Sequence, residues 1–259
     1  MGRNIRVEGI TLHSRRFMEF HKDVTILSRE GGVFNAVLHG GYKGKSRMAG
    51  GTEPFRRVAF LLYHDPVKDT YKISDGEIIN SFENLRLVLP KIYLASLWSE
   101  LMIRTRGAGA GFEEGERVYF LLLKALEVLE TIETRKLPYL NIQFLWRFLA
   151  LSGLSMDFSS CSSCGRGLDE GETLIYSSRE IGFLCENCKR RSVFNERQSL
   201  SPGAAKYLSR TQGLDILSSI KIIPPQGDLT TLESIPLEMM ISEMDIHFKT
   251  QDYHQFMDV

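Results

Sequence analysis

The residues best suited to metal binding or other chemistry are the four cysteines of the 259-residue chain, Cys161, Cys164, Cys185 and Cys188. They form two Cys-x-x-Cys pairs separated by twenty residues. The two-residue spacing lets both thiolates of a pair bind one ion, and two pairs complete a tetrahedral shell of four sulfurs. This donor set favours Zn²⁺, with iron bound by four thiolates as the alternative. Because four protein ligands leave no position for water or substrate, we expect one structural zinc ion per chain.

The residues around the cysteines are consistent with this interpretation. Gly165 and Gly167 follow the first pair, where the chain must turn around the metal, and the runs 173–176 and 181–184 resemble the two strands of a hairpin. The sequence pattern does not place either pair between a strand and a helix, as a thioredoxin-type redox site would require, so we do not expect a redox pair. Four unrelated buried cysteines would not be expected to show this regular spacing.

A second segment, Gly40-Gly41-Tyr42-Lys43-Gly44-Lys45-Ser46-Arg47, combines glycines with basic residues. Gly44-Lys45-Ser46 matches the end of a phosphate-binding P-loop, but His39 stands where the first glycine of that motif should be. Gly50, Gly51 and Pro54 also follow too soon for the helix that a P-loop needs. We therefore favour a flexible cationic loop that meets nucleic-acid phosphates, with Tyr42 or Phe55 stacking on a base. A solvated surface loop remains the alternative.

Charge is distributed unevenly along a chain whose formal net charge is zero. Residues 1–57 contain eleven Lys and Arg against five Asp and Glu, whereas residues 225–259 contain one Lys against seven acids. A basic N-terminal part suits a polyanion, and the acidic C-terminal part would repel one. The residues expected to contact DNA are Lys43, Lys45, Arg47 and Tyr42, supported by Arg15, Arg16, Arg56 and Arg57.

No catalytic pattern emerges from the sequence. The six histidines form no His-Glu-x-x-His pair, and there is no Gly-x-Ser-x-Gly motif. We expect a protein that is not an enzyme. The first residues lack the apolar core of a signal peptide, and no window approaches eighteen uninterrupted apolar residues. These features predict a cytoplasmic protein that makes no use of a membrane.

Apolar residues follow a strand pattern in the first eighty residues and a helical pattern after them. Strands are expected at 5–13, 23–28, 33–38, 57–63, 71–74 and 77–81, with turns at 29–32, 65–66 and 75–76. Five or six strands with no helix between them predict a small closed barrel. Helices are expected within 82–106, over 116–132 and 140–151, after Ser201-Pro202 and over 230–248, with a glycine-rich linker at 107–111.

These elements predict an α+β protein of several domains. The expected parts are a nucleic-acid-binding barrel over 1–81, a helical domain over 82–157, an inserted four-cysteine zinc module over 158–192, and a helical tail over 193–259 that packs on the helical domain.

This order of parts resembles the bacterial RecO family of recombination mediators. The likeness lies in Ile10–Glu19 with Asp23–Leu27, in the basic loop from Gly40 to Phe55, and in the segment from Cys161 to Cys188, and it spans roughly residues 5–190. Two departures are Gly44, where a bulkier residue or proline is common, and the single glycine of Glu180-Ile181-Gly182. Neither departure removes a cysteine or a basic residue.

The resemblance implies that the barrel is an oligonucleotide-binding (OB) fold. It further implies binding of single- and double-stranded DNA, annealing of complementary strands in gap repair and homologous recombination, association with the nucleoid, and work with a RecR partner and single-strand-binding protein. A zinc-ribbon protein that binds RNA or assists transcription shares the charge pattern and is the alternative. An NTPase built on Gly44-Lys45-Ser46 is a third hypothesis.

Overall fold

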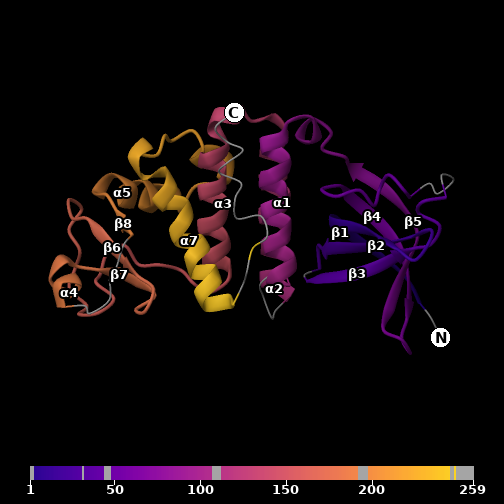
Figure 1. The fold of residues 1–259 in the computed structure, drawn as a ribbon, viewed down its shortest axis with the longest axis horizontal. Helices are drawn as coiled ribbons and strands as arrows, with labels where there is room; N and C mark the ends of the chain where they lie inside the picture. Colours follow the sequence, from indigo (N-terminus) through magenta and orange to yellow (C-terminus); the bar gives the residue numbers. More distant parts are fainter. Residues whose placement is uncertain are drawn as a thin grey trace. The chain divides into compact units, whose positions relative to one another are not determined.

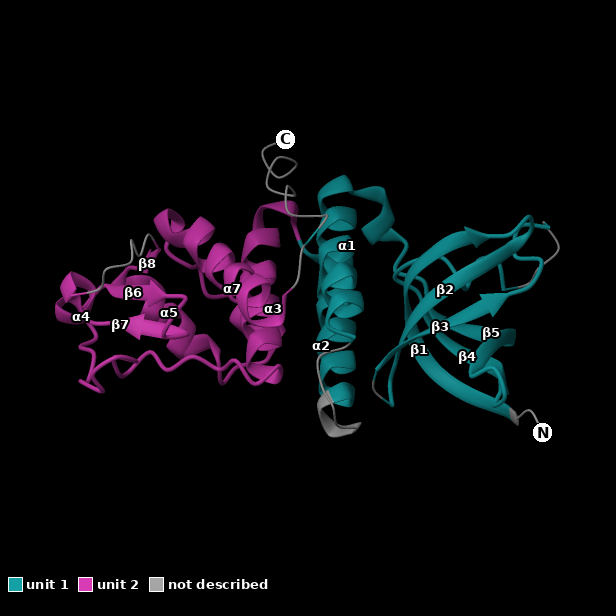
Figure 2. Ribbon diagram, turned by 60° about the horizontal axis from the view of Figure 1, so that its bottom comes forward, with its two compact units in different colours: residues 1–132, 248–259 teal, residues 133–247 magenta. Residues whose placement is uncertain are grey.

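The computed structural model describes residues 3–30, 32–43, 48–106, 112–191, 198–245 and 248. The chain forms two compact units, one of residues 1–132 with 248–259 and one of residues 133–247 (Figure 2). The two units are defined by compactness alone. The four domains expected from the sequence therefore stay a prediction.

Unit 1 begins with a closed five-stranded barrel (Figure 1). The order around the barrel is β1-β2-β3-β5-β4, with β1 pairing with both β2 and β4, and β3 closing the barrel in parallel against β5. This is the arrangement of an OB-type barrel, as expected. The strands are β1 Arg3–Phe17, β2 His21–Ser28, β3 Val33–Leu38, β4 Arg57–Asp65 and β5 Thr70–Asn80.

Alternating apolar residues fill the barrel, because successive side chains of a strand point to opposite faces. The interior is formed by Val24, Ile26, Ala36, Leu38, Met48, Val58, Phe60, Leu62 and Ile73. Met48 comes from the segment between β3 and β4, so this connection contributes to the core as well as to the surface.

The turn expected at Asp75-Gly76 does not exist, and a single strand runs through it. The register against β4 shifts between Leu61 and Leu62, which absorbs an extra residue of β5 as a bulge. Gly76 permits close packing rather than a turn, because a Cβ there would lie 2.9 Å from the carbonyl oxygen of Ala59. Glycine inside a strand is ambiguous between these two roles, and the tertiary pairing decides.

Two helices complete unit 1. After the 3₁₀ turn η1 Asn84–Leu87, helix α1 Leu89–Arg104 begins with a proline in its first turn and contacts β1. Helix α2 Phe112–Thr131 contacts β2. The glycine-rich linker expected at 107–111 lies outside the described residues.

Unit 2 is built on α3 Leu137–Leu151, which follows the 3₁₀ turn η2 Thr134–Lys136 and packs along α7 Leu229–Met244. Shorter elements surround this pair: α5 Pro202–Thr211, α6 Ile216–Ser219 and the 3₁₀ turn η3 Gln226–Asp228. Within this unit the C-terminal helix α7 thus contacts α3, while the expected helical tail over 193–259 stays a prediction.

The cysteine segment adds a small antiparallel sheet of order β7-β6-β8 to unit 2. The expected hairpin is present as β6 Leu174–Ser177 and β7 Gly182–Leu184, while β8 Ser199–Leu200 and the short helix α4 Glu186–Arg191 were not expected. Contrary to expectation, the second cysteine pair therefore does lie between a strand and a helix, and the short α4 contains Cys188. Among the described residues, none of the helices combines the length and hydropathy needed to cross a bilayer.

Candidate metal centre and nucleic-acid interface

The four cysteine sulfurs converge on one point of unit 2. Sγ atoms of Cys161, Cys164, Cys185 and Cys188 all lie within 4.8 Å of one another, and those of Cys164 and Cys185 are 4.0 Å apart. Zinc–sulfur bonds of about 2.3 Å in a tetrahedron require sulfurs about 3.8 Å apart. The cluster therefore has the size and the donor chemistry of a four-thiolate metal site.

Local backbone geometry explains this convergence. Gly165 adopts a φ of +71° and donates its N–H to the carbonyl oxygen of Cys161 at 2.8 Å, which closes the first turn. Cys185 follows β7, and its N–H donates to Sγ of Cys161 at 3.3 Å. Gly182 lets the two halves approach, since a Cβ there would lie 1.9 Å from Oγ of Ser162.

The thiols also favour a bound cation electrostatically. The backbone N–H of Cys188, together with the Arg166 guanidinium, lowers the pKa of Cys185 to about 6. In contrast, the contact with Cys164 and then burial raise the pKa of Cys188 to about 12. Four thiols this close cannot all ionise unless a positive charge lies among them. A metal cation bound by the four sulfurs would supply that charge.

The residues expected to contact DNA differ in their exposure and in whether they are already paired within the protein. Tyr42 and Lys43 are exposed on the loop that follows β3, and Arg16 lies near the end of β1 with its guanidinium 5.7 Å from the Tyr42 ring. Lys45 and Arg47 lie outside the described residues. Phe55, the other candidate for stacking, is buried. Tyr42 is thus the exposed aromatic of the two.

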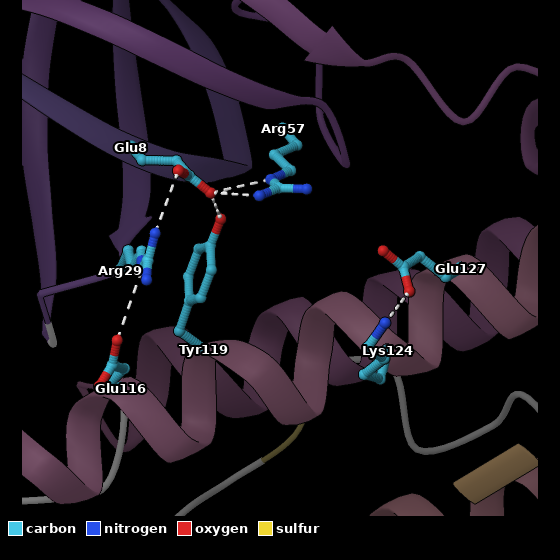
Figure 3. A network of polar contacts seen from close by, with 7 residues as sticks. All are labelled: Glu8, Arg29, Arg57, Glu116, Tyr119, Lys124 and Glu127. Carbon is cyan, nitrogen blue, oxygen red and sulfur yellow. Dashed lines mark hydrogen bonds and ion pairs between the residues drawn. The ribbon is translucent and has the colours of Figure 1, made fainter.

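Of the remaining arginines, Arg57 and Arg15 are paired with carboxylates within the protein, whereas Nε of Arg56 is buried without a hydrogen-bond partner among the described residues. Arg57 donates from Nε and Nη2 to Oε1 of Glu8 at 2.9 and 2.6 Å (Figure 3). Arg15 pairs with Asp23 at 2.8 Å. Burial lowers the pKa of Arg86, and the nearby positive charge of Arg56 lowers it further.

Figure 3 shows that Glu8 is the centre of a network between the barrel and α2. The Tyr119 hydroxyl donates to Oε1 of Glu8 at 2.9 Å, and Arg29 lies between Glu8 and Glu116. Burial alone would raise the pKa of Glu8, but the hydrogen bonds from Arg57 and Tyr119 hold it below its ordinary value. Burial and the bond to Glu8 raise the pKa of Tyr119.

Sequence reasoning missed Phe20, which lies in the turn between β1 and β2. Its ring is exposed, and Nζ of Lys43 lies 4.9 Å from the ring centre. The available signal was an aromatic residue in a turn of the basic N-terminal segment. Only the fold places this turn beside the loop of Tyr42, since the two aromatic residues are twenty-two positions apart.

Comparison with known proteins agrees with this architecture. The family profile described as "Recombination protein O N terminal" matches residues 1–82, and "Recombination protein O C terminal" matches residues 89–228.

Individual relatives carry the same name. A "DNA repair protein RecO" of Caldanaerobacter subterraneus subsp. tengcongensis is 24% identical over 257 residues, which is 97% of each chain. The protein of that name from Oceanobacillus iheyensis is 31% identical over 183 residues, 71% of this chain and 67% of the relative. The one from Bacillus pumilus is 28% identical over 207 residues, 79% of this chain and 75% of the relative. With both halves matched by its profiles, this chain belongs to the RecO family of DNA repair and recombination proteins.

Proposed function

We propose that this protein is a non-catalytic mediator that binds single- and double-stranded DNA and anneals complementary strands during recombinational gap repair. The observation that carries the proposal is the closed OB-type barrel with Arg16, Tyr42 and Lys43 exposed at one edge of it. Family membership supports the role in repair. Annealing requires neutralised backbone charge and accessible bases, but no covalent chemistry.

The proposed phosphate contacts come from Arg16 and Lys43 together with Lys45 and Arg47. Arg56 supports them next to Arg86. Arg57 and Arg15 contribute less, because each already pairs with a carboxylate of the barrel. This division predicts that the loop after β3, rather than the whole basic segment, determines the salt dependence of binding.

Zinc is proposed as the metal of the four-cysteine cluster. Cys161, Cys164, Cys185 and Cys188 would hold one ion, which neutralises their charge and joins the turn after Ser160 to the start of α4. With all four ligands from protein, the ion serves folding and takes no part in a reaction.

Proposed partners are a RecR protein and single-strand-binding protein. The direct test is annealing of complementary DNA oligonucleotides, bare or coated with single-strand-binding protein, with and without RecR. Faster annealing by this protein on both substrates is expected. Absence of annealing together with exclusive binding of RNA would instead support the zinc-ribbon RNA-binding alternative.

A further inference from the structure

We propose that Phe20 and Tyr42 form a two-ring platform on which unpaired bases of single-stranded DNA stack, with Arg16 and Lys43 beside it for the phosphates. This inference rests on the proposed function, because it assigns the base-contacting part of that DNA site. We call the four residues the platform.

Hydrogen bonds donated by two backbone N–H groups hold the two halves of the platform together. The N–H of Tyr42 donates to the carbonyl oxygen of Phe20 at 3.1 Å, and the N–H of Gly40 donates to Nδ1 of His21 at 3.0 Å. The turn between β1 and β2 is therefore tied to the loop after β3. A binding surface that is held in place before the ligand arrives loses less conformational entropy on binding.

Two glycines allow this close approach. Gly40 adopts a φ of +68°, which residues with a Cβ rarely tolerate. At Gly41 a Cβ would lie 2.9 Å from Cγ of Lys22 and 3.2 Å from Cδ2 of Leu38. The loop thus lies directly on the barrel, and Tyr42 projects from a supported backbone.

The rings are accessible to a ligand. Phe20 and Tyr42 are 41% and 47% exposed, and Met18 in the same turn is 72% exposed. Large apolar side chains gathered at one place on the surface usually mark a binding site. Successive bases stack on such rings in proteins that bind single strands.

The cations of the platform are available for phosphates. Nζ of Lys43 lies 4.9 Å from the Phe20 ring, and the Arg16 guanidinium donates to the backbone carbonyl oxygen of Glu19. No ion pair within the described residues involves Arg16 or Lys43. Lys22 also lies near the Tyr42 ring, but it is buried and paired with Glu53 at 2.6 Å. Two unneutralised cations therefore accompany two exposed rings.

The chemistry selects single strands, because a duplex hides the faces of its bases in the stack. Phosphate contacts alone would serve single and double strands alike. The platform therefore adds affinity only where bases are unpaired. Single-stranded gaps, which repair by recombination must process, present such bases.

A matched control exists at the opposite end of β2. There the Arg29 guanidinium lies 5.4 Å from the partly exposed Phe120 ring, but Arg29 is neutralised by Glu8 and Glu116. Phe120→Leu changes a comparable ring beside a comparable cation without touching the platform.

The experiment measures fluorescence anisotropy of two labelled oligomers of equal length, one of thymidine and one of abasic sites. Phe20→Leu and Tyr42→Leu should each weaken binding of the thymidine oligomer roughly tenfold, as loss of one stacked base predicts. Affinity for the abasic oligomer and the salt dependence should not change, since the charges remain. Phe120→Leu should match the wild type on both oligomers.

A second readout does not depend on lost affinity. Phe20→Trp and Tyr42→Trp should bind normally, and their added fluorescence should be quenched by the thymidine oligomer but not by the abasic one. Phe120→Trp should show no quenching.

The possible failures are distinguishable. Wild-type affinity of both leucine variants for the thymidine oligomer, or equal losses on both oligomers, would overturn the platform while leaving the proposed function standing. A wild-type protein that binds no DNA of either kind would overturn the proposed function itself.

Discussion

At the scale of single residues, the environment of each arginine decides what it can do. The side chains of Arg57 and Glu8 are only 25% and 21% exposed, and their bonds lie within a network that also includes Tyr119. The Arg15 side chain, by contrast, is 67% exposed in its pair with Asp23. Exposed ion pairs contribute little to stability, whereas a partly buried carboxylate that loses its partner is costly.

Arg57→Ala should lower the free energy of unfolding by about 1–3 kcal/mol at neutral pH, because Glu8 would keep its burial but lose two hydrogen bonds. The bonds that depress the pKa of Glu8 stabilise the fold above the ordinary glutamate pKa, and this stability is lost as the pH falls through the depressed value. Urea unfolding should show that the difference in unfolding free energy between Arg57→Ala and the wild type is smaller at about pH 3 than at neutral pH.

Arg15→Ala is the control for this prediction and should change stability by less than about 1 kcal/mol. Equal effects of the two substitutions at neutral pH would contradict a special role for the Glu8 network.

At the scale of elements, α7 contains a proline that the helix accommodates through a tertiary contact. Pro236 has no N–H to donate to the carbonyl oxygen of Leu232, four residues earlier. The indole N–H of Trp146 on α3 donates to that oxygen instead, at 2.8 Å. Since α3 and α7 pack together, the missing helix bond becomes a bond between helices.

Trp146→Phe should therefore destabilise the protein by about 1–3 kcal/mol, because it leaves a buried carbonyl oxygen without a donor. In a Pro236→Ala background the same change should cost less, since the introduced alanine can supply the N–H. A double-mutant cycle from urea unfolding measures this coupling. Strictly additive effects would mean that Trp146 acts by packing alone.

The four-cysteine segment is the second element whose stability depends on a specific feature. Its hydrophobic cluster is small and includes Cys161 and Cys185 themselves, with Ile175 and Leu184. So few apolar residues cannot by themselves compensate the entropy of ordering the segment. Metal binding then becomes part of its folding.

Elemental analysis of the purified protein should find one zinc per chain. Cys185→Ser should lose the metal and lower Tm by about 10 °C if the module contributes about 3 kcal/mol or more. Binding of DNA by the barrel should change far less. Native protein that contains neither zinc nor iron would refute the metal site.

At the scale of the whole molecule, charge separates the N-terminal and C-terminal parts of the chain. Residues 225–259 contain seven acids and one lysine, and the apolar residues Leu232, Ile235, Met239 and Met240 of α7 are buried. The acidic part would repel phosphates, so DNA should bind to the barrel.

Replacement of Lys43, Lys45 and Arg47 by alanine should weaken binding of all DNA sequences alike. It should also flatten the log–log salt dependence on single strands by about two units if all three engage phosphates.

Charge reversal at Glu238 and Glu243 should leave affinity at high salt unchanged. Anisotropy titrations across salt concentrations test both, with zinc content and Tm as controls for folding. A triple variant that keeps the wild-type slope would move the DNA site, with Lys189, Arg190 and Arg191 as the next candidates.

Local patterns in the sequence were enough to predict the main strands and helices and the cysteine cluster. Alternation of apolar residues predicted the barrel and the hairpin of β6 and β7, and the spacing of Cys161, Cys164, Cys185 and Cys188 predicted their convergence. Such features depend on residues close together in the chain, where backbone geometry alone limits which side chains can meet.

Only the tertiary structure decided which side chains remain free to act. Glu8 meets Tyr119 across 111 positions, and Trp146 meets Leu232 across 86. Phe20 gains its place beside Tyr42 only when the barrel closes. The physical reason is that burial and pairing depend on elements brought together by the fold, so the sequence shows a basic segment but not which of its charges are already neutralised.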